Sequence, residues 1–138
     1  MRAVVVHSPG EFDALVIEEV PNPKPGQGEV LIKVAFAGCN WADTQVRSGN
    51  YPHPYNFPVI PGLEVSGTVL GLGAGVDHLT IGDRVTALPN MGGYAEKCVA
   101  DASLVTKLPD AVGLDVGAAF PVQALTAFHM PVSYTHLT

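Results

Sequence analysis

The sequence predicts a mainly β fold that ends in helices, and three observations support this prediction. Short runs of β-branched and alternating residues recur through the first 108 positions. The 15 glycines and 12 prolines are scattered between those runs, which suits short strands joined by tight turns. After Gly113 the apolar residues change to a helical spacing. We therefore expect an open β-barrel or sandwich over residues 1–112, followed by helices over residues 113–131.

Composition narrows the classes of protein that fit. A chain of 138 residues with 47% apolar and 14% charged residues is long and apolar enough for a globular domain with its own core. The net charge of −6, without any basic cluster, argues against a nucleic-acid surface. Cys39 and Cys98 form no motif, which favours a reducing, cytoplasmic setting. The sequence shows neither a signal peptide nor an apolar run of membrane-spanning length, so we expect no membrane partner.

The strands are predicted from alternation and from the turn residues between them. The first two form an N-terminal hairpin, and Ala35-Phe36-Ala37 predicts that the third is buried on both faces in its second half. Pro58 and Pro61 hold the chain extended ahead of the fourth. The expected segments are Arg2–His7, Leu15–Val20, Val30–Ala37, Leu63–Leu70, Gly82–Leu88 (a turn plus a strand), Tyr94–Ala100 and Ser103–Leu108.

A short helix is predicted over Trp41–Arg47, where Asn40 can cap its start. Asp43 and Arg47 stand four residues apart on this helix and are expected to form an exposed pair. Glu64 is a second conspicuous residue, because a carboxylate at the head of a central strand is costly to bury without a partner. It is either a structural glutamate satisfied by nearby donors or part of a cleft wall.

Two helical segments, Leu114–Phe120 and Val122–Met130, are predicted on either side of Pro121. The following residues Val132–Thr138 (VSYTHLT) resemble the in-frame translation of a sequencing adapter. We interpret residues 132–138 as a non-native tail. The alternative is a frayed polar terminus.

Few motifs point to chemistry on spacing alone. The glycines of Gly71–Gly75 (GLGAG) follow a strand but open no helix, so they predict a turn rather than a phosphate loop. The histidines are dispersed and predict no metal site. Asn40, Thr44 and Tyr51 together could orient a planar polar ligand, although capping and packing explain the same residues, and spacing alone favours that structural explanation.

Several longer segments resemble the medium-chain dehydrogenase/reductase superfamily, and in particular its zinc-free quinone oxidoreductase branch. They are AGCNWADTQVRSGNYP, FPVIPGLEVSGTVLGLGAGV, IGDRVTAL, GGYAEKCVA and FPVQALTAFHM. The resemblance implies a GroES-like, partly open β-barrel with a short helix after Asn40. It also implies that the C-terminal helix begins a Rossmann domain that binds NADPH and is missing from this chain, which alone is expected to be inactive.

The departures from the zinc alcohol dehydrogenases matter as well. Asn40 stands where those enzymes carry a cysteine ligand, with Cys39 one position early. Gly62-Leu63-Glu64 replaces their Gly-His-Glu, so the histidine ligand is absent too. The resemblance therefore implies an enzyme without zinc.

In the resembling enzymes, the segment matching Asn40–Thr44 and the residues matching Tyr51 and Thr126 lie near the nicotinamide and its ribose. The resemblance thus implies cofactor binding by Asn40, Asp43, Thr44, Tyr51 and Thr126. Asn40 and Tyr51 would also act in catalysis, by hydrogen-bonding the oxyanion that develops on a quinone or enone. Glu64 would support the loop from behind.

Two alternatives stay open at this point. One is an enoyl reductase of the same superfamily, which Gln45, placed where relatives often have an aromatic residue, does not decide. The other is a non-catalytic GroES-like binding module, against which the helical stretch AAFPVQALTAFHM argues. Whether the parent protein is a homodimer is also open.

Overall fold

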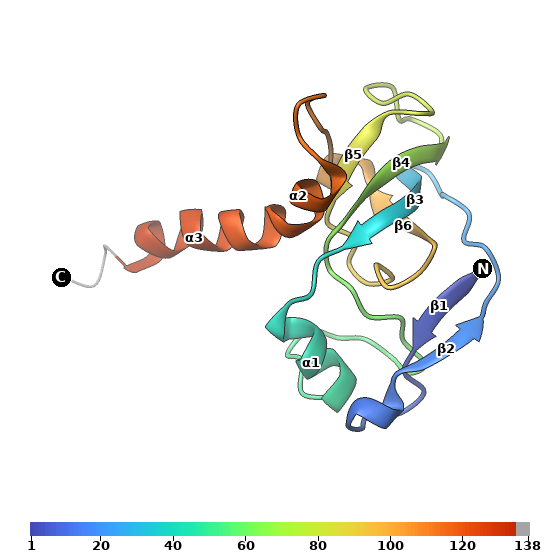
Figure 1. Cartoon of the computed structure of the whole chain (residues 1–138), viewed down its shortest axis with the longest axis vertical. Coiled ribbons are helices and arrows are strands. Elements are labelled where there is room, and N and C mark those ends of the chain that lie inside the picture. Colours follow the sequence, from blue (N-terminus) through green and yellow to red (C-terminus); the bar gives the residue numbers. More distant parts are fainter. Residues whose placement is uncertain (135–138) are drawn as a thin grey trace.

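The computed structural model describes the backbone of residues 1–134 and the side chains of residues 1–130. A two-stranded sheet, a five-stranded sheet and the short helix α1 form the main body. The last helix, α3 (Pro121–Tyr134), projects away from that body (Figure 1). The two sheets are not closed into a barrel. The predicted mainly β, partly open architecture is confirmed.

The N-terminal hairpin forms as predicted. Strands β1 (Arg2–Val5) and β2 (Val16–Glu19) pair antiparallel, and the 3₁₀ turn η1 (Phe12–Ala14) lies in the loop between them. The backbone N–H of Val4 donates to the carbonyl of Tyr94 at 2.8 Å. This bond attaches the hairpin to the rest of the fold.

The larger sheet has the order β6-β3-β4-β5-β7, and every pairing in it is antiparallel. Gly67 lies where β3 and β4 approach closely, and a Cβ there would come within 1.9 Å of the Lys33 carbonyl oxygen. The strands are β3 (Glu29–Ala37), β4 (Val65–Leu72), β5 (Arg84–Ala87), β6 (Lys97–Asp101) and β7 (Val105–Lys107), with the 3₁₀ turn η2 (Ala102–Leu104) before the last.

Two apolar clusters hold the body together. The larger one lies against the five-stranded sheet and is built mainly of β-branched side chains from alternate strand positions. It includes Val30, Ile32, Val65, Val69 and Val85. The smaller cluster joins α1 to the hairpin through Val6, Val46 and Val59. The exposed part of β3 departs from the prediction: Phe36 is 49% exposed, because β6 pairs only with Glu29–Lys33 and leaves that end of β3 uncovered.

Helix α1 (Trp41–Ser48) begins after Asn40 as predicted and ends at Gly49, whose φ of 79° suits glycine. The expected Asp43–Arg47 pair is wrong. Asp43 is buried, and Arg47 turns toward the N-terminal loop, where its guanidinium donates to the Gly10 carbonyl at 3.1 Å. Asp43 has donors in the interior instead, and the Arg47 side chain, only 12% exposed, is held against the N-terminal loop.

Helix α2 (Leu114–Ala119) packs on the sheet through Gly117 and Ala118, and α3 follows after Phe120. Pro121 occupies the first position of α3, where its missing N–H costs no helical hydrogen bond, so the predicted break is confirmed as a joint between two helices. The backbone helix continues to Tyr134, past the predicted limit of residue 131. The rest of the predicted tail, residues 135–138, lies outside the described residues.

Candidate functional site

The candidate site lies where α1, β4 and α3 begin. Glu64, directly before β4, is only 1% exposed. One carboxylate oxygen accepts a hydrogen bond from the Asn40 side-chain amide at 2.9 Å, and the other accepts from the backbone N–H of Val122 at 2.8 Å. A buried carboxylate is tolerated because it has such donors. The structure therefore favours the first of the two interpretations of Glu64, a structural glutamate satisfied by nearby donors. It lies between the start of α1 and the start of α3.

The backbone has to leave room for this carboxylate. Gly38 lies directly beneath it, and a Cβ on Gly38 would come within 2.3 Å of a Glu64 carboxylate oxygen. The N–H of Gly38 also donates to the backbone carbonyl of Glu64 at 3.0 Å. Gly38 is thus required by close packing rather than by an unusual φ.

Asn40 has the extended backbone of an N-cap residue and forms a capping-box arrangement with Asp43, although its side chain makes no full hydrogen bond to the helix backbone. Its amide N–H instead reaches Glu64, and its amide oxygen accepts from the Gln123 side chain at 2.7 Å. Asp43 supports the helix start in its place, by accepting from the backbone N–H of Asn40 at 2.8 Å. The Asn40 side chain is therefore available for contacts outside α1.

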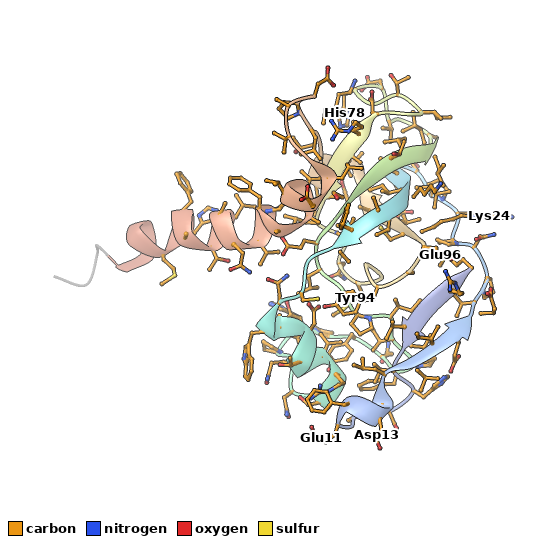
Figure 2. The ribbon with its side chains drawn as sticks, viewed as in Figure 1. Glu11, Asp13, Lys24, His78, Tyr94 and Glu96 are labelled. Carbon is orange, nitrogen blue, oxygen red and sulfur yellow. The ribbon has the colours of Figure 1, made fainter. Side chains whose placement is uncertain are left out.

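The buried carboxylate of Asp43 connects three segments of the chain. Besides Asn40, its carboxylate accepts from the N–H of Gly62 at 3.2 Å and from the hydroxyl of Tyr94 at 2.8 Å. Figure 2 shows Tyr94 between α1 and the five-stranded sheet. Burial, together with Cys39 and Asp43 beside it, raises the pKa of Tyr94, so its hydroxyl stays protonated and can donate.

Tyr94 was missed from sequence, since it was expected only as a residue of a strand. The useful signal was the Gly92-Gly93 pair before it: a Cβ on Gly93 would come within 2.9 Å of the Gly62 carbonyl oxygen. Close approach of these two glycine loops brings Tyr94 to Asp43.

The remaining predicted site residues are placed as follows. The hydroxyl of Thr44 donates to the Trp41 carbonyl at 2.7 Å. Tyr51 packs edge-on against His53 with 5.4 Å between ring centroids. Thr126 is exposed on α3, three residues after Gln123, so both side chains share one face of that helix. The structure joins Asn40 directly to α3, whereas it shows no hydrogen bond that links Tyr51 or Thr126 to Asn40 among the described side chains.

Two cavities among the described residues lie away from the Asn40–Glu64 contact. One of about 360 Å³ is lined by the hairpin, the end of β3 and Tyr94, and an apolar one of about 330 Å³ lies between β7 and α2.

Among the described residues, no group of three or more His, Cys, Asp or Glu side chains is placed to hold a metal ion. In the same part of the chain, no helix combines the length and hydrophobicity needed to cross a bilayer.

Comparison with known proteins agrees with this architecture. The alcohol dehydrogenase GroES-like domain model matches residues 26–110. The chain belongs to the alcohol dehydrogenase GroES-like domain family. The predicted resemblance to the quinone oxidoreductases of the medium-chain dehydrogenase/reductase superfamily is confirmed, because several similar proteins carry that name.

Three of those relatives illustrate the point. The mouse synaptic vesicle membrane protein VAT-1 homolog-like is 39% identical over 94% of this chain and 31% of its own length. Quinone oxidoreductase from Lama guanicoe is 39% identical over 93% of this chain and 39% of its own. The Escherichia coli quinone oxidoreductase complexed with NADPH superposes with a TM-score of 0.89 at 30% identity, over 94% of this chain and 40% of that one. The GroES-like chain thus spans between 31% and 40% of these relatives.

Proposed function

We propose that the complete protein is an NADPH-dependent oxidoreductase that transfers hydride to a quinone or an enone without zinc. Relatives named quinone oxidoreductase support the reaction, and the Escherichia coli relative, solved as a complex with NADPH, supports the cofactor. In this proposal the described chain supplies the residues that orient the acceptor and donate hydrogen bonds to it. It is the GroES-like part of the enzyme.

The observation that carries the proposal is the state of the Asn40 amide. One of its two N–H groups is bound to Glu64, and its oxygen is bound to Gln123. The other N–H has no protein acceptor among the described residues, and the side chain is only half-buried. A fixed amide with one free donor suits the oxygen of a carbonyl that gains negative charge as hydride arrives.

Three of the other predicted residues are neutral and polar, which fits the uncharged end of the cofactor. Thr44, Tyr51 and Thr126 carry hydroxyls that can bond a carboxamide or ribose hydroxyls. NADPH would supply the hydride, and these side chains would hold its ring in position. Both carboxylate oxygens of Asp43 already bind protein donors, so its support for the site is a contribution through α1 and Tyr94.

Zinc independence is part of the proposal and has its own test. The Asn40 amide is hydrogen-bonded to the Glu64 carboxylate and the Gln123 amide. None of these three side chains offers the sulfur or imidazole ligands that zinc prefers. We expect the rate of NADPH oxidation by the complete protein to be unchanged after incubation with a strong zinc chelator. A rate that falls with chelator and returns with added zinc would contradict this.

An enoyl reductase remains the second candidate, because the same donor arrangement would serve an enoyl thioester.

A cytoplasmic location and dimerisation of the parent stay predictions. A purely binding role is disfavoured by exposed apolar side chains on and beside α3, the helix that projects from the body (Figure 1): Phe128 on α3 is 70% exposed, and Phe120, directly before α3, is 64% exposed.

The decisive experiment uses the complete protein and follows NADPH oxidation with a panel of small quinones, enones and an enoyl thioester. Asn40→Ala is expected to lower kcat by about a hundredfold, because the oxyanion loses a donor. Asn56→Ala, which alters an exposed asparagine, is the matched control and should leave kcat unchanged. Activity confined to the thioester would favour the enoyl reductase, and absence of turnover with every acceptor would contradict an oxidoreductase.

A further inference from the structure

We propose that Glu64 and Gln123 are positioning residues that fix the orientation of the Asn40 amide and couple it to the start of α3. This inference deepens the proposed function and rests on it. It concerns two residues that touch neither acceptor nor cofactor in that proposal. Both act through Asn40.

The first step concerns the direction of the amide. An ionised carboxylate only accepts hydrogen bonds, so Glu64 requires the nitrogen of Asn40 to face it. The amide oxygen of Asn40 then faces the Gln123 nitrogen. Rotating the Asn40 amide by half a turn would place its oxygen against the buried carboxylate of Glu64, which is unfavourable. Glu64 therefore selects one of the two amide orientations and, through Asn40, the orientation of Gln123 as well.

The second step concerns the connection to α3. The second oxygen of Glu64 accepts from the N–H of Val122, one of the backbone donors in the first turn that have no partner within the helix. The negative charge also lies at the positive end of the helix dipole. Because Gln123 is the next residue, α3 contacts both Glu64 and Asn40 through one turn.

The third step is the consequence for the free donor. Asn40 lies at the start of α1, which Asp43 holds through its bonds to Gly62 and Tyr94. The amide of Asn40 is held on its nitrogen side by Glu64, directly before β4, and on its oxygen side by Gln123 on α3. A shift of α3 would therefore remove the Gln123 contact of Asn40 and the Val122 contact of Glu64, and so loosen the donor of Asn40, while leaving α1 in place. The geometry makes the catalytic donor dependent on the helix that leads out of the GroES-like domain.

The experiment compares single variants with a double variant in the complete protein. In Glu64→Gln, the new amide has one oxygen for two donors, so either Asn40 or Val122 loses its acceptor. In Glu64→Gln with Gln123→Glu, every hydrogen bond can be remade: the new amide at position 64 accepts from Val122 and donates to the Asn40 oxygen. The Asn40 nitrogen then faces the new carboxylate at position 123, so the amide direction is reversed.

Two readouts separate positioning from plain structure. Hydrogen exchange at the start of α3, followed by mass spectrometry, reports the coupling without any need for activity. The kcat with the best acceptor reports the donor. We expect Glu64→Gln to speed exchange at the start of α3 and to lower kcat about tenfold or more, with a smaller change in the KM for the acceptor. The double variant should recover slow exchange but not kcat.

Matched controls are Glu11→Gln and Gln27→Ala, which alter exposed residues away from the site and should change neither readout. Exchange in Glu64→Gln equal to that of the controls would overturn the coupling. Recovery of kcat together with exchange in the double variant would overturn the positioning role, because it would show that only the connection matters. If the unaltered protein turns over no acceptor, the proposed function fails, and the exchange result alone decides whether the coupling exists.

Discussion

At the scale of single residues, the fold depends on a few buried polar groups that each join separate segments. Asp43 accepts hydrogen bonds from Asn40, Gly62 and Tyr94, which come from three different parts of the chain. Removing one donor leaves a buried acceptor partly unsatisfied, and that is more costly than the hydrogen bond alone. Such residues decide stability although they add little apolar area.

Tyr94→Phe is expected to lower the free energy of unfolding by about 1–3 kcal/mol, because Asp43 loses a donor in the interior. Urea unfolding followed by circular dichroism measures the change. Tyr55→Phe is a comparison with another half-buried hydroxyl: Tyr55 donates to the Val46 carbonyl at 2.9 Å, so its removal leaves no carboxylate unsatisfied. A Tyr94→Phe loss no larger than the Tyr55→Phe loss would contradict the role given to Asp43.

The two cysteines are expected to differ in reactivity and in their effect at alkaline pH. Burial raises the pKa of Cys98 to about 12, whereas Cys39 is exposed. The unfolded thiol ionises near pH 9 and the folded one does not, so the unfolded state binds fewer protons above that pH. The free energy of unfolding should therefore fall as pH rises from about 9 to about 12.

A thiol reagent such as Ellman's reagent tests the first part: Cys39 should react at once, and Cys98 only as the chain unfolds. Urea unfolding across the alkaline range tests the second. Cys98→Ala should show a weaker fall with pH than the unaltered chain. An equally steep fall would mean that other groups account for it.

At the scale of elements, sequence patterns located the strands and helices well because those patterns reflect the backbone itself. Alternation, glycine turns and Pro121 gave each strand and each α-helix to within a few residues, but not the two 3₁₀ turns. The side-chain roles were harder. Asn40 was correctly expected at the N-cap position, but its amide is used by Glu64 and Gln123, and no local pattern reports partners that lie 24 and 83 positions away.

Gly38→Ala is expected to lower the free energy of unfolding by about 1–3 kcal/mol, because the added methyl would overlap the Glu64 carboxylate and the Ala118 carbonyl. Gly71→Ala is the matched control. Its Cβ would meet Leu31 at an ordinary 3.6 Å, and we expect little change there. Equal effects at both positions, measured by urea unfolding, would show that the space beneath Glu64 is not needed.

At the scale of the whole molecule, sequence could predict which residues are apolar but not what covers them. Ala35-Phe36-Ala37 looked like a strand buried on both faces, yet β6 does not extend along the second half of β3, which pairs with β4 only on its other edge, and Phe36 is 49% exposed. The same holds for the apolar side chains along α3. Coverage depends on which elements pack against a strand or helix in three dimensions, which alternation along a strand does not encode.

The 138-residue chain is expected to bind a hydrophobic dye through α3. Leu125 and Phe128 are 45% and 70% exposed, three residues apart on one face of the helix. Phe128→Lys should therefore reduce the fluorescence of bound anilinonaphthalene sulfonate. Ile81→Lys removes a side chain that is 64% exposed in a turn and is the matched control. Equal reductions in the two variants would contradict a patch on α3.

The hydrogen bond from Val122 to Glu64 has a consequence for how this family can vary. The donor is a backbone N–H, so any side chain can occupy position 122 except proline, which has no N–H to give. Position 40 is different, because there the donor is the side chain itself. Related proteins that keep a glutamate at position 64 should thus vary freely at position 122 while retaining a side-chain donor at position 40, and proteins that lose the glutamate should be released from both restrictions at once.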